Sequence, residues 1–216
     1  KKNLEIIVNY KATLKANKVE RFTRYVINIV DKNSTDNIEL MYEKAKEELD
    51  TLANKGFDNS LKENTEYYAN VWENCDIEID GDLKNQQGIR FCIFQLQQTY
   101  HGFAKDNNIG AKGLTGEAYS GHAFWDSETY CLPYYLFSNK EAAKNLLMFR
   151  YNTLEEAKNR AKDLDCEGAC YPIATRNGQE GCNLWQHASL QFQPSTGVAY
   201  AIYHYMNLYD DHKFMQ

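Results

Sequence analysis

The sequence predicts a mainly α-helical protein with a short β segment at its start. From residue 36 onward, apolar residues recur at spacings of three and four, which is the period of one face of a helix. Only three prolines interrupt the 216 residues. Before residue 31, two stretches are instead rich in β-branched and aromatic residues, as strands are. The expected core is therefore helical, and the expected sheet is small.

The expected strands cover residues 4–10 and 19–30. The second stretch, VERFTRYVINIV, has side chains that alternate along its length as those of a strand do. Two strands are too few to form a stable sheet alone. We therefore expect their sheet partners to lie outside this chain.

Three helices are expected in the next part of the chain. The first carries apolar residues at helical spacing from 38 to 53, and Gly56 stands where a C-terminal cap belongs. A second amphipathic stretch runs over 59–75 and is broken by an acidic turn, DIEIDGD, at 76–82. A third helix is expected over 84–101.

Helices return in the second half of the chain, between two long irregular segments. Thr153 and Glu156 have the spacing of a capping box, which predicts a helix start there. The irregular segments are 102–122, which holds five glycines, and 167–195, and loops of such length are commonly functional. The further helices are expected at 125–137, 139–150, 153–164 and 194–208.

Composition excludes several classes of partner. The formal net charge is −6, and its 24 basic residues form no run, which argues against nucleic acid and anionic membrane surfaces. No apolar run approaches the roughly 18 to 20 residues that cross a bilayer, and the start lacks a signal peptide, so we expect a cytoplasmic protein. The six cysteines lack the common zinc spacings, which favours buried thiols over a metal site. Lys112 lies between glycines without the full phosphate-loop pattern.

The stretch GEAYSGHAFWDSETY, residues 116–130, holds the strongest candidates for binding. Trp125 offers a flat face to the C–H face of a sugar ring, and Asp126 offers a carboxylate to its hydroxyls. The alternative is that Asp126 caps the helix that follows and that Trp125 is packing. Spacing alone does not decide between these roles.

Other polar side chains in these loops have two interpretations each. Glu117 and Glu128 are candidates for the general acid of glycosyl transfer, although a solvated or structural role is the more common one for a glutamate. His122 and His187 are placed to bond either a sugar hydroxyl or a backbone carbonyl.

Several long blocks resemble the catalytic domain of glycoside hydrolase family 65, in the order in which that family has them. This family includes maltose, trehalose, kojibiose and nigerose phosphorylases. The resemblance implies a partial (α/α)6 barrel, or toroid, at 76–216, a helical linker at 34–75, and the last strands of an N-terminal β-sandwich at 1–33. The blocks are GIRFCIFQLQQTYHG, IGAKGLTGEAYSGHAFWDSETYCLPYYLFSN, AAKNLLMFRYNTLEEAKNRA and LWQHASLQFQPSTGVAYAIYHY.

The resemblance also implies a reaction, in which phosphate attacks an α-glucoside with inversion to give β-glucose 1-phosphate. The partners would be a glucose-containing disaccharide and inorganic phosphate, with no cofactor and no metal, and the family's tendency to dimerise suggests a homodimer. The Phe-Trp-Asp motif of the glucosyl pocket matches Phe124, Trp125 and Asp126. We expect the substrate-binding residues to be these three together with the remaining candidates, His122, His187 and Glu117.

The general acid of the family lies in an Asp-Glu-Tyr-His type motif that does not occur in this sequence. We therefore expect the acid beyond Gln216, and we expect this chain to be a truncated, inactive piece with exposed apolar helix faces. Two alternatives stay open. One is a hydrolase of the same fold that uses water, and the other is a non-catalytic carbohydrate-binding helical domain.

Overall fold

The structure is a computed structural model of the chain. It describes residues 7–30, 37–114, 116 and 118–216. The chain divides into two compact units, one up to Asn70 and one from Val71 onward. Each unit is described by itself below.

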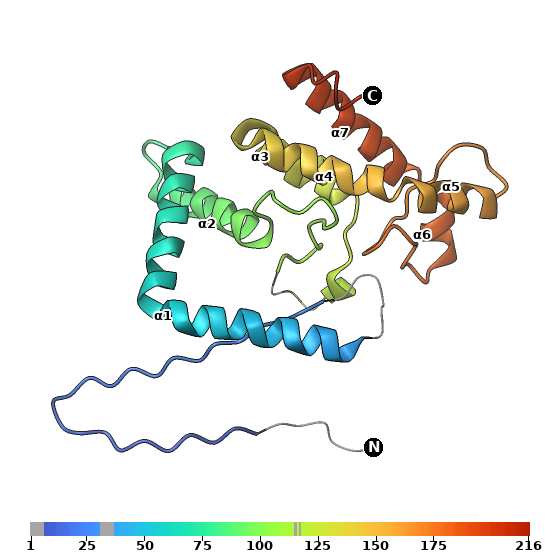
Figure 1. The fold of residues 1–216 in the computed structure, drawn as a ribbon. Helices are drawn as coiled ribbons and strands as arrows, with labels where there is room; N and C mark the ends of the chain where they lie inside the picture. The colour runs from blue at the N-terminus through green and yellow to red at the C-terminus, as the bar shows by residue number, and fades with distance from the viewer. Residues whose placement is uncertain (1–6, 31–36, 115, 117) are drawn as a thin grey trace. The chain divides into compact units, whose positions relative to one another are not determined.

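In the first unit, the expected strands are not formed. Residues 7–30 contain no strand, and Figure 1 draws them as a plain trace, while residues 4–6 lie outside the described part of the chain. A strand needs a neighbour to accept and donate its backbone hydrogen bonds. Here the backbone N–H of Lys18 bonds the carbonyl of Lys15, which makes a turn rather than a ladder. The alternating pattern therefore does not suffice to form a strand without pairing partners.

Helix α1 (Ile38–Cys75) follows, and it breaks where the sequence predicts. Gly56 has φ 77° and ψ 168°, which lies outside the helical region, so the element is two helical pieces joined at that glycine. A residue with a Cβ is rarely found at such a positive φ. The predicted break at Gly56 is confirmed.

The second unit is helical, and its helices fall close to the predicted ranges with one addition. A short helix at residues 185–190 lies inside the segment that was expected to be irregular. The elements are α2 (Leu83–Thr99), a 3-10 turn (Ala118–Gly121), a π-helical turn (Ser127–Cys131), α3 (Leu132–Ser138), α4 (Lys140–Asn152), α5 (Leu154–Asp163), α6 (Trp185–Leu190) and α7 (Gln193–Tyr209).

The predicted capping box at Thr153 is wrong. The Thr153 hydroxyl bonds back to the carbonyls of Phe149 (2.9 Å) and Arg150 (3.3 Å) instead of capping α5. The reason is that α4 ends at Asn152, so a single residue joins the two helices. The hydroxyl of Thr153 therefore satisfies the last turn of α4 rather than the first turn of α5.

The core of the second unit lies where α3, α4 and α7 pack together. Tyr135 is fully buried, and its hydroxyl bonds the carbonyls of Leu96 and Tyr100 at the end of α2. This contact ties α2 to α3. The buried core residues are Tyr100, Ile109, Leu132, Tyr135, Leu136, Ala142, Ala143, Leu146, Leu147, Ala201 and Tyr205.

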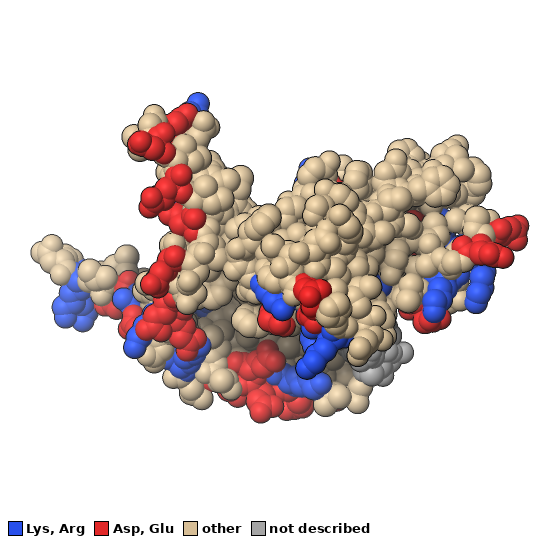
Figure 2. Space-filling view, turned by 90° about the horizontal axis from the view of Figure 1, so that it is seen from above, with Lys and Arg blue, Asp and Glu red and all other residues tan. Residues whose placement is uncertain are grey.

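Helices α3 and α7 also form an uncharged outer surface, as expected for exposed apolar helix faces. Neither helix contains an acidic or basic residue apart from histidine. Figure 2 shows wide uncharged areas on the face that includes these helices. A groove of about 350 Å³ runs between α3 and α7, and Phe137 and Tyr200 at its edge are largely exposed. Among the described residues, no helix is long and apolar enough to cross a membrane.

One close backbone approach in this unit gives a test of its packing. Gly102 has φ 89°, and its carbonyl accepts a hydrogen bond from Asn145 (2.6 Å). A Cβ added to Gly102 would lie 2.6 Å from the Cβ of Ala142 on α4. We expect Gly102→Ala to lower the free energy of unfolding by about 2–4 kcal/mol, through backbone strain and overpacking, in urea titrations.

The control for this prediction is Gly81→Ala. Gly81 has a similar φ of 83°, but an added Cβ would meet no atom within 4 Å. It should cost only the strain, about 1–2 kcal/mol. Equal losses in the two variants would contradict the close packing of Gly102 on α4.

Candidate functional site

The Phe124–Asp126 segment is held at its start by a short backbone pairing with a distant loop. Ala123 and Thr175 form an antiparallel bridge, in which each N–H bonds the other's carbonyl (2.8 and 2.9 Å). The carbonyl of the preceding residue, His122, accepts a bond from the N–H of Ala111 (3.0 Å). Both Ala123 and Thr175 are buried. The segment therefore enters the site at a fixed position between two loops.

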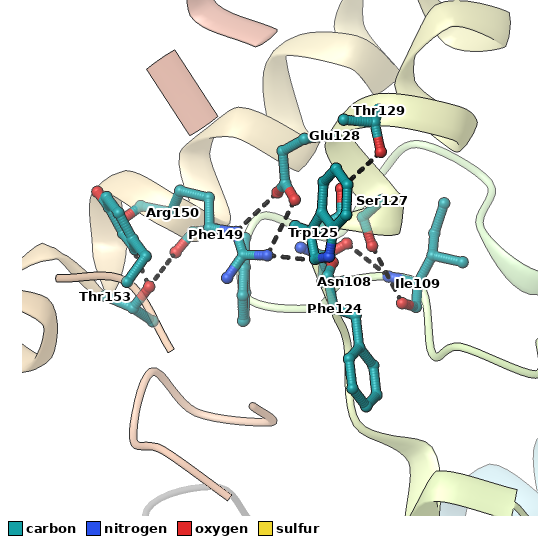
Figure 3. Close-up of polar contacts among 11 residues, drawn as sticks. Asn108, Ile109, Phe124, Trp125, Ser127, Glu128, Thr129, Phe149, Arg150 and Thr153 are labelled. Carbon is teal, nitrogen blue, oxygen red and sulfur yellow. Dashed lines mark hydrogen bonds and ion pairs between the residues drawn. The ribbon is translucent and has the colours of Figure 1, made fainter. Parts of the chain in front are cut away.

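A buried ion pair lies next to the segment and contacts its backbone. The guanidinium of Arg150, on α4, donates from Nε to Glu128 Oε1 (2.7 Å) and from Nη2 to Glu128 Oε2 (3.0 Å). Arg150 Nη2 also donates to the carbonyl of Phe124 (3.3 Å), as Figure 3 shows. The side chains of Arg150 and Glu128 are only 1% and 3% exposed. Because both carboxylate oxygens are bonded to the arginine, this arrangement favours a structural role for Glu128 over that of a general acid.

A π-helical turn carries the chain from Trp125 into α3. The carbonyl of Trp125 accepts bonds from the backbone N–H groups of Glu128 and Thr129 and from the Thr129 hydroxyl (each 3.1 Å). The buried Ser127 hydroxyl donates to the carbonyl of Ile109 (3.2 Å). Turns of this kind are rare and occur often at functional sites.

The two central side chains of the motif remain partly open to solvent. Trp125 is half-buried, and the Cβ of an alanine at Gly197 of α7 would lie 3.6 Å from its Cβ, so the indole packs on a helix without a side chain at that point. Asp126 is exposed and makes no capping bond to the helix that follows. The structure thus argues against the capping role for Asp126 and leaves its carboxylate accessible to a ligand.

Asp126 affects a neighbouring thiol. Burial, together with the negative charges of Asp126 and Glu128, raises the pKa of Cys131 to about 11. A thiolate at this position would lie near two carboxylates. Cys131 is therefore expected to stay protonated at neutral pH.

His122 lies beside the segment and directly follows a left-handed stretch of backbone. Tyr119, Ser120 and Gly121 all have positive φ (62°, 51° and 71°), and such strained conformations gather at functional sites. His122 Nδ1 is 2.7 Å from the carbonyl of Tyr119, and the Tyr119 ring packs edge-on against Phe124 (5.3 Å between centroids). The structure therefore brings His122 next to the motif.

Of the two remaining candidates, the structure describes only His187, which lies apart from these contacts. His187 is exposed on α6, and its Nδ1 lies 3.0 Å from the side-chain amide of Gln191. Glu117 lies outside the described residues. Their predicted roles in substrate binding stay predictions.

Glu180 shapes the loop that pairs with Ala123, and the sequence reasoning missed it. Its carboxylate accepts backbone N–H bonds from Ile173 (2.9 Å), Ala174 (3.4 Å) and Cys182 (2.9 Å). Arg160 lies 3.8 Å away and neutralises part of its charge. This carboxylate holds the loop in shape for the bridge to Ala123.

No group of three or more metal-ligating side chains is present in the part of the chain that the structure describes.

Arg150 was also missed, although the sequence holds a signal for it. It is a basic residue at the end of a largely apolar stretch, LLMFR, on a helix whose neighbouring residues are buried. A charged side chain in that position needs an opposite charge, because a lone buried charge is costly. Glu128 is buried as well, so the two form a natural pair in the folded chain, although the polar sequence around Glu128 gives no such signal.

The ion pair gives a prediction about stability. The Glu128→Gln variant would leave the guanidinium of Arg150 buried without an anion, so we expect the free energy of unfolding to fall by about 3–5 kcal/mol in urea titrations. The matched control is Glu155→Gln, which removes an exposed pair with Lys158. That change should leave the free energy of unfolding nearly unchanged, because an exposed ion pair contributes little to stability. A Glu128→Gln loss as small as the control would contradict the burial of the pair.

The raised pKa of Cys131 gives a second prediction. At pH 8, iodoacetamide should modify Cys131 about 100-fold more slowly than the exposed Cys166, because the thiolate is the reacting form. Peptide mass spectrometry after timed labelling of the folded chain measures both rates. Asp126→Asn should increase the rate at Cys131 by removing one negative charge. Equal rates at the two cysteines in the unmodified chain would contradict this picture of the site.

The chain matches proteins of known families along most of its length. Residues 90–216 match the sequence profile of the glycosyl hydrolase family 65 central catalytic domain. Maltose phosphorylase of Bacillus subtilis (strain 168) is 42% identical over 179 residues, which are 82% of this chain and 24% of that protein. Alpha,alpha-trehalose phosphorylase of Thermoanaerobacter brockii is 40% identical over 171 residues, 79% of this chain and 22% of that protein.

A kojibiose phosphorylase of Thermoanaerobacter brockii is 32% identical over 188 residues, 82% of this chain and 24% of that protein. Among solved structures, a candidate kojibiose phosphorylase from human microbiome has 62% sequence identity and a TM-score of 0.81, over 87% of this chain and 25% of that one. This chain thus spans about a quarter of the length of these relatives. The profile match over its second unit and the identities to these phosphorylases show that the chain belongs to glycosyl hydrolase family 65.

Proposed function

We propose that this chain holds the glucosyl unit of the substrate in an inverting disaccharide phosphorylase. In the proposed reaction, a phosphate oxygen attacks the anomeric carbon of an α-glucoside while the glycosidic C–O bond breaks. An acid gives a proton to the leaving oxygen, which yields β-glucose 1-phosphate and the freed acceptor sugar. Membership of the family and the phosphorylase names of the relatives support this proposal.

The observation that carries the proposal is the pairing of Trp125 with an unengaged Asp126. The indole is half-buried and fixed against α7, whereas the carboxylate next to it is exposed and makes no capping bond. An aromatic face and an adjacent carboxylate suit the C–H face and the hydroxyl edge of a pyranose. Phe124 and His122 adjoin the pair in the chain and are proposed to complete the sugar site.

The proton donor is proposed to be a residue other than Glu128. A general acid needs a carboxyl that can hold a proton near the leaving oxygen, but Glu128 is buried and bonded through both oxygens to Arg150. The Asp-Glu-Tyr-His type motif of the family is absent from the sequence, which favours an acid beyond Gln216. The chain alone would then bind sugar without turning it over.

The proposal extends to architecture and setting. Residues 76–216 would be part of an (α/α)6 barrel, 34–75 the linker helices, and 1–33 the end of a β-sandwich. The likeness in fold to the candidate kojibiose phosphorylase supports a shared architecture. The relatives also support a disaccharide and phosphate as the partners. A cytoplasmic homodimer that needs no cofactor completes the proposal.

The first test of this function is sugar binding and turnover by the 216-residue chain. Maltose, kojibiose and trehalose are titrated with isothermal calorimetry, and release of glucose and glucose 1-phosphate is measured with and without phosphate. We expect binding of at least one disaccharide, no turnover, and an affinity about 10-fold to 100-fold lower for Asp126→Asn, because a hydrogen bond to a charged group is lost. Asp163→Asn, an exposed aspartate on α5, is the control and should bind normally.

Each other outcome changes the proposal in a defined way. Phosphate-dependent release of glucose 1-phosphate would place the acid within this chain and leave Glu117 as the first candidate. Release of glucose without phosphate would favour the hydrolase. Equal binding by Asp126→Asn and the unmodified chain would remove Asp126 from the sugar site.

A further inference from the structure

We propose that Arg150 and Glu128 are positioning residues, which set the geometry of Trp125 and Asp126 without touching the sugar. This inference rests on the proposed function for the role of the two positioned side chains. The evidence for it lies in the backbone contacts of the pair.

The peptide groups on both sides of Trp125 are held, one by the Arg150 side chain and the other by the backbone of Glu128, whose side chain is fixed by the arginine. On the N-terminal side, the carbonyl of Phe124 accepts a bond from Nη2 of Arg150 (3.3 Å). On the C-terminal side, the carbonyl of Trp125 accepts a bond from the backbone N–H of Glu128 (3.1 Å). A peptide group is planar, so fixing one carbonyl orients the whole unit. The direction in which the Trp125 side chain leaves the backbone is therefore set from both sides.

The backbone of Arg150 is itself held by hydrogen bonds and by the packing of α4. Its carbonyl accepts bonds from the Tyr171 hydroxyl (3.0 Å) and from the Thr153 hydroxyl (3.3 Å). The neighbouring Phe149 and Leu147 on α4 are buried in the helical unit. A side chain can orient another group only if its own position is fixed by packing and hydrogen bonds. The close-up in Figure 3 shows Arg150 between Glu128 and the Phe124 carbonyl.

Burial leaves almost no surface of the two side chains for direct contact with a substrate. The two side chains are 1% and 3% exposed, and the bonds between them occupy both oxygens of Glu128. Stability alone does not explain such a pair, because well-packed apolar residues in place of a buried ion pair are often as stable or more so. Orienting the backbone of the Phe124–Asp126 segment is a role that apolar residues could not fill. Nη1 of Arg150 is buried with no hydrogen-bond partner among the described residues. The guanidinium is therefore oriented by the contacts of Nε and Nη2 with Glu128 and Phe124, and not by bonds from all of its nitrogens.

The test uses the tryptophans as reporters of geometry. The chain has three, at 72, 125 and 185. Labelling with 5-fluorotryptophan gives one ¹⁹F signal for each, and Trp125→Phe identifies the signal of Trp125. The double variant Arg150→Met/Glu128→Leu removes both charges, so that neither is left buried and unpaired.

We expect the double variant to keep its helical circular dichroism while the Trp125 signal shifts or broadens. The signals of Trp72 and Trp185 should stay in place. Affinity for the disaccharide bound by the unmodified chain should fall about 10-fold to 100-fold, because small misplacements of binding groups are costly. An unchanged Trp125 signal would overturn the inference.

The matched control is Lys144→Met/Asp211→Leu. Lys144 lies on the same helix, α4, and its bond to Asp211 (3.1 Å) does not involve the Phe124–Asp126 segment. This control should leave the Trp125 signal and the sugar affinity unchanged. A shift as large as that of the Arg150/Glu128 variant would show that any lost ion pair disturbs Trp125 and would overturn the inference.

Two further outcomes are covered. If the double variant does not fold, Arg150→Lys decides, because lysine keeps the charge but not the planar fork that reaches Glu128 and the Phe124 carbonyl together. An unmoved Trp125 signal in that variant would overturn the inference. If the unmodified chain binds no sugar, the proposed function fails, while the ¹⁹F signals still decide whether the pair positions Trp125.

Discussion

The buried ion pair of Arg150 and Glu128 is the constraint on which the candidate site depends. Two charges taken out of water are costly, and their attraction compensates only when the geometry is good and other polar groups are satisfied. The forked contact and the bond to the Phe124 carbonyl provide that geometry, although Nη1 of Arg150 has no hydrogen-bond partner among the described residues. The pair therefore joins α4, the π-helical turn and the Phe124–Asp126 segment, and none of the three can shift without leaving a buried charge poorly paired.

Local patterns predicted the helices well because each helix satisfies its own backbone. Gly56 breaks α1 where its conformational freedom is needed, and the apolar spacing found α2, α4 and α7. Predictions failed where the outcome depends on partners far away in the sequence. The strands expected at 4–10 and 19–30 are not formed within the described residues 7–30, because a strand needs a pairing neighbour. The hydroxyl of Thr153 bonds α4 because the junction between the helices is a single residue. The pattern at Thr153 could not reveal that competition.

The sequence could propose residues for the candidate site but not the contacts that hold them in place. Phe124, Trp125 and Asp126 stand out by type and by resemblance, since an aromatic beside a carboxylate is a chemical signature. Arg150 and Glu180 do not stand out in that way. Arg150 contacts a segment more than twenty residues away, and that contact exists only in the folded chain. Glu180 holds its loop through backbone N–H groups, which carry no sequence signal at all.

The two carboxylates of the motif region show how environment separates their roles. Asp126 and Glu128 are two residues apart, yet the π-helical turn leaves the first exposed and buries the second against Arg150. The arginine neutralises Glu128, so the charge that faces solvent at this turn is that of Asp126. A pocket for a neutral sugar gains from this arrangement, because a single carboxylate can accept hydroxyl hydrogen bonds without a second, repelling charge beside it. The sequence alone does not show which of the two carboxylates is exposed and which is buried.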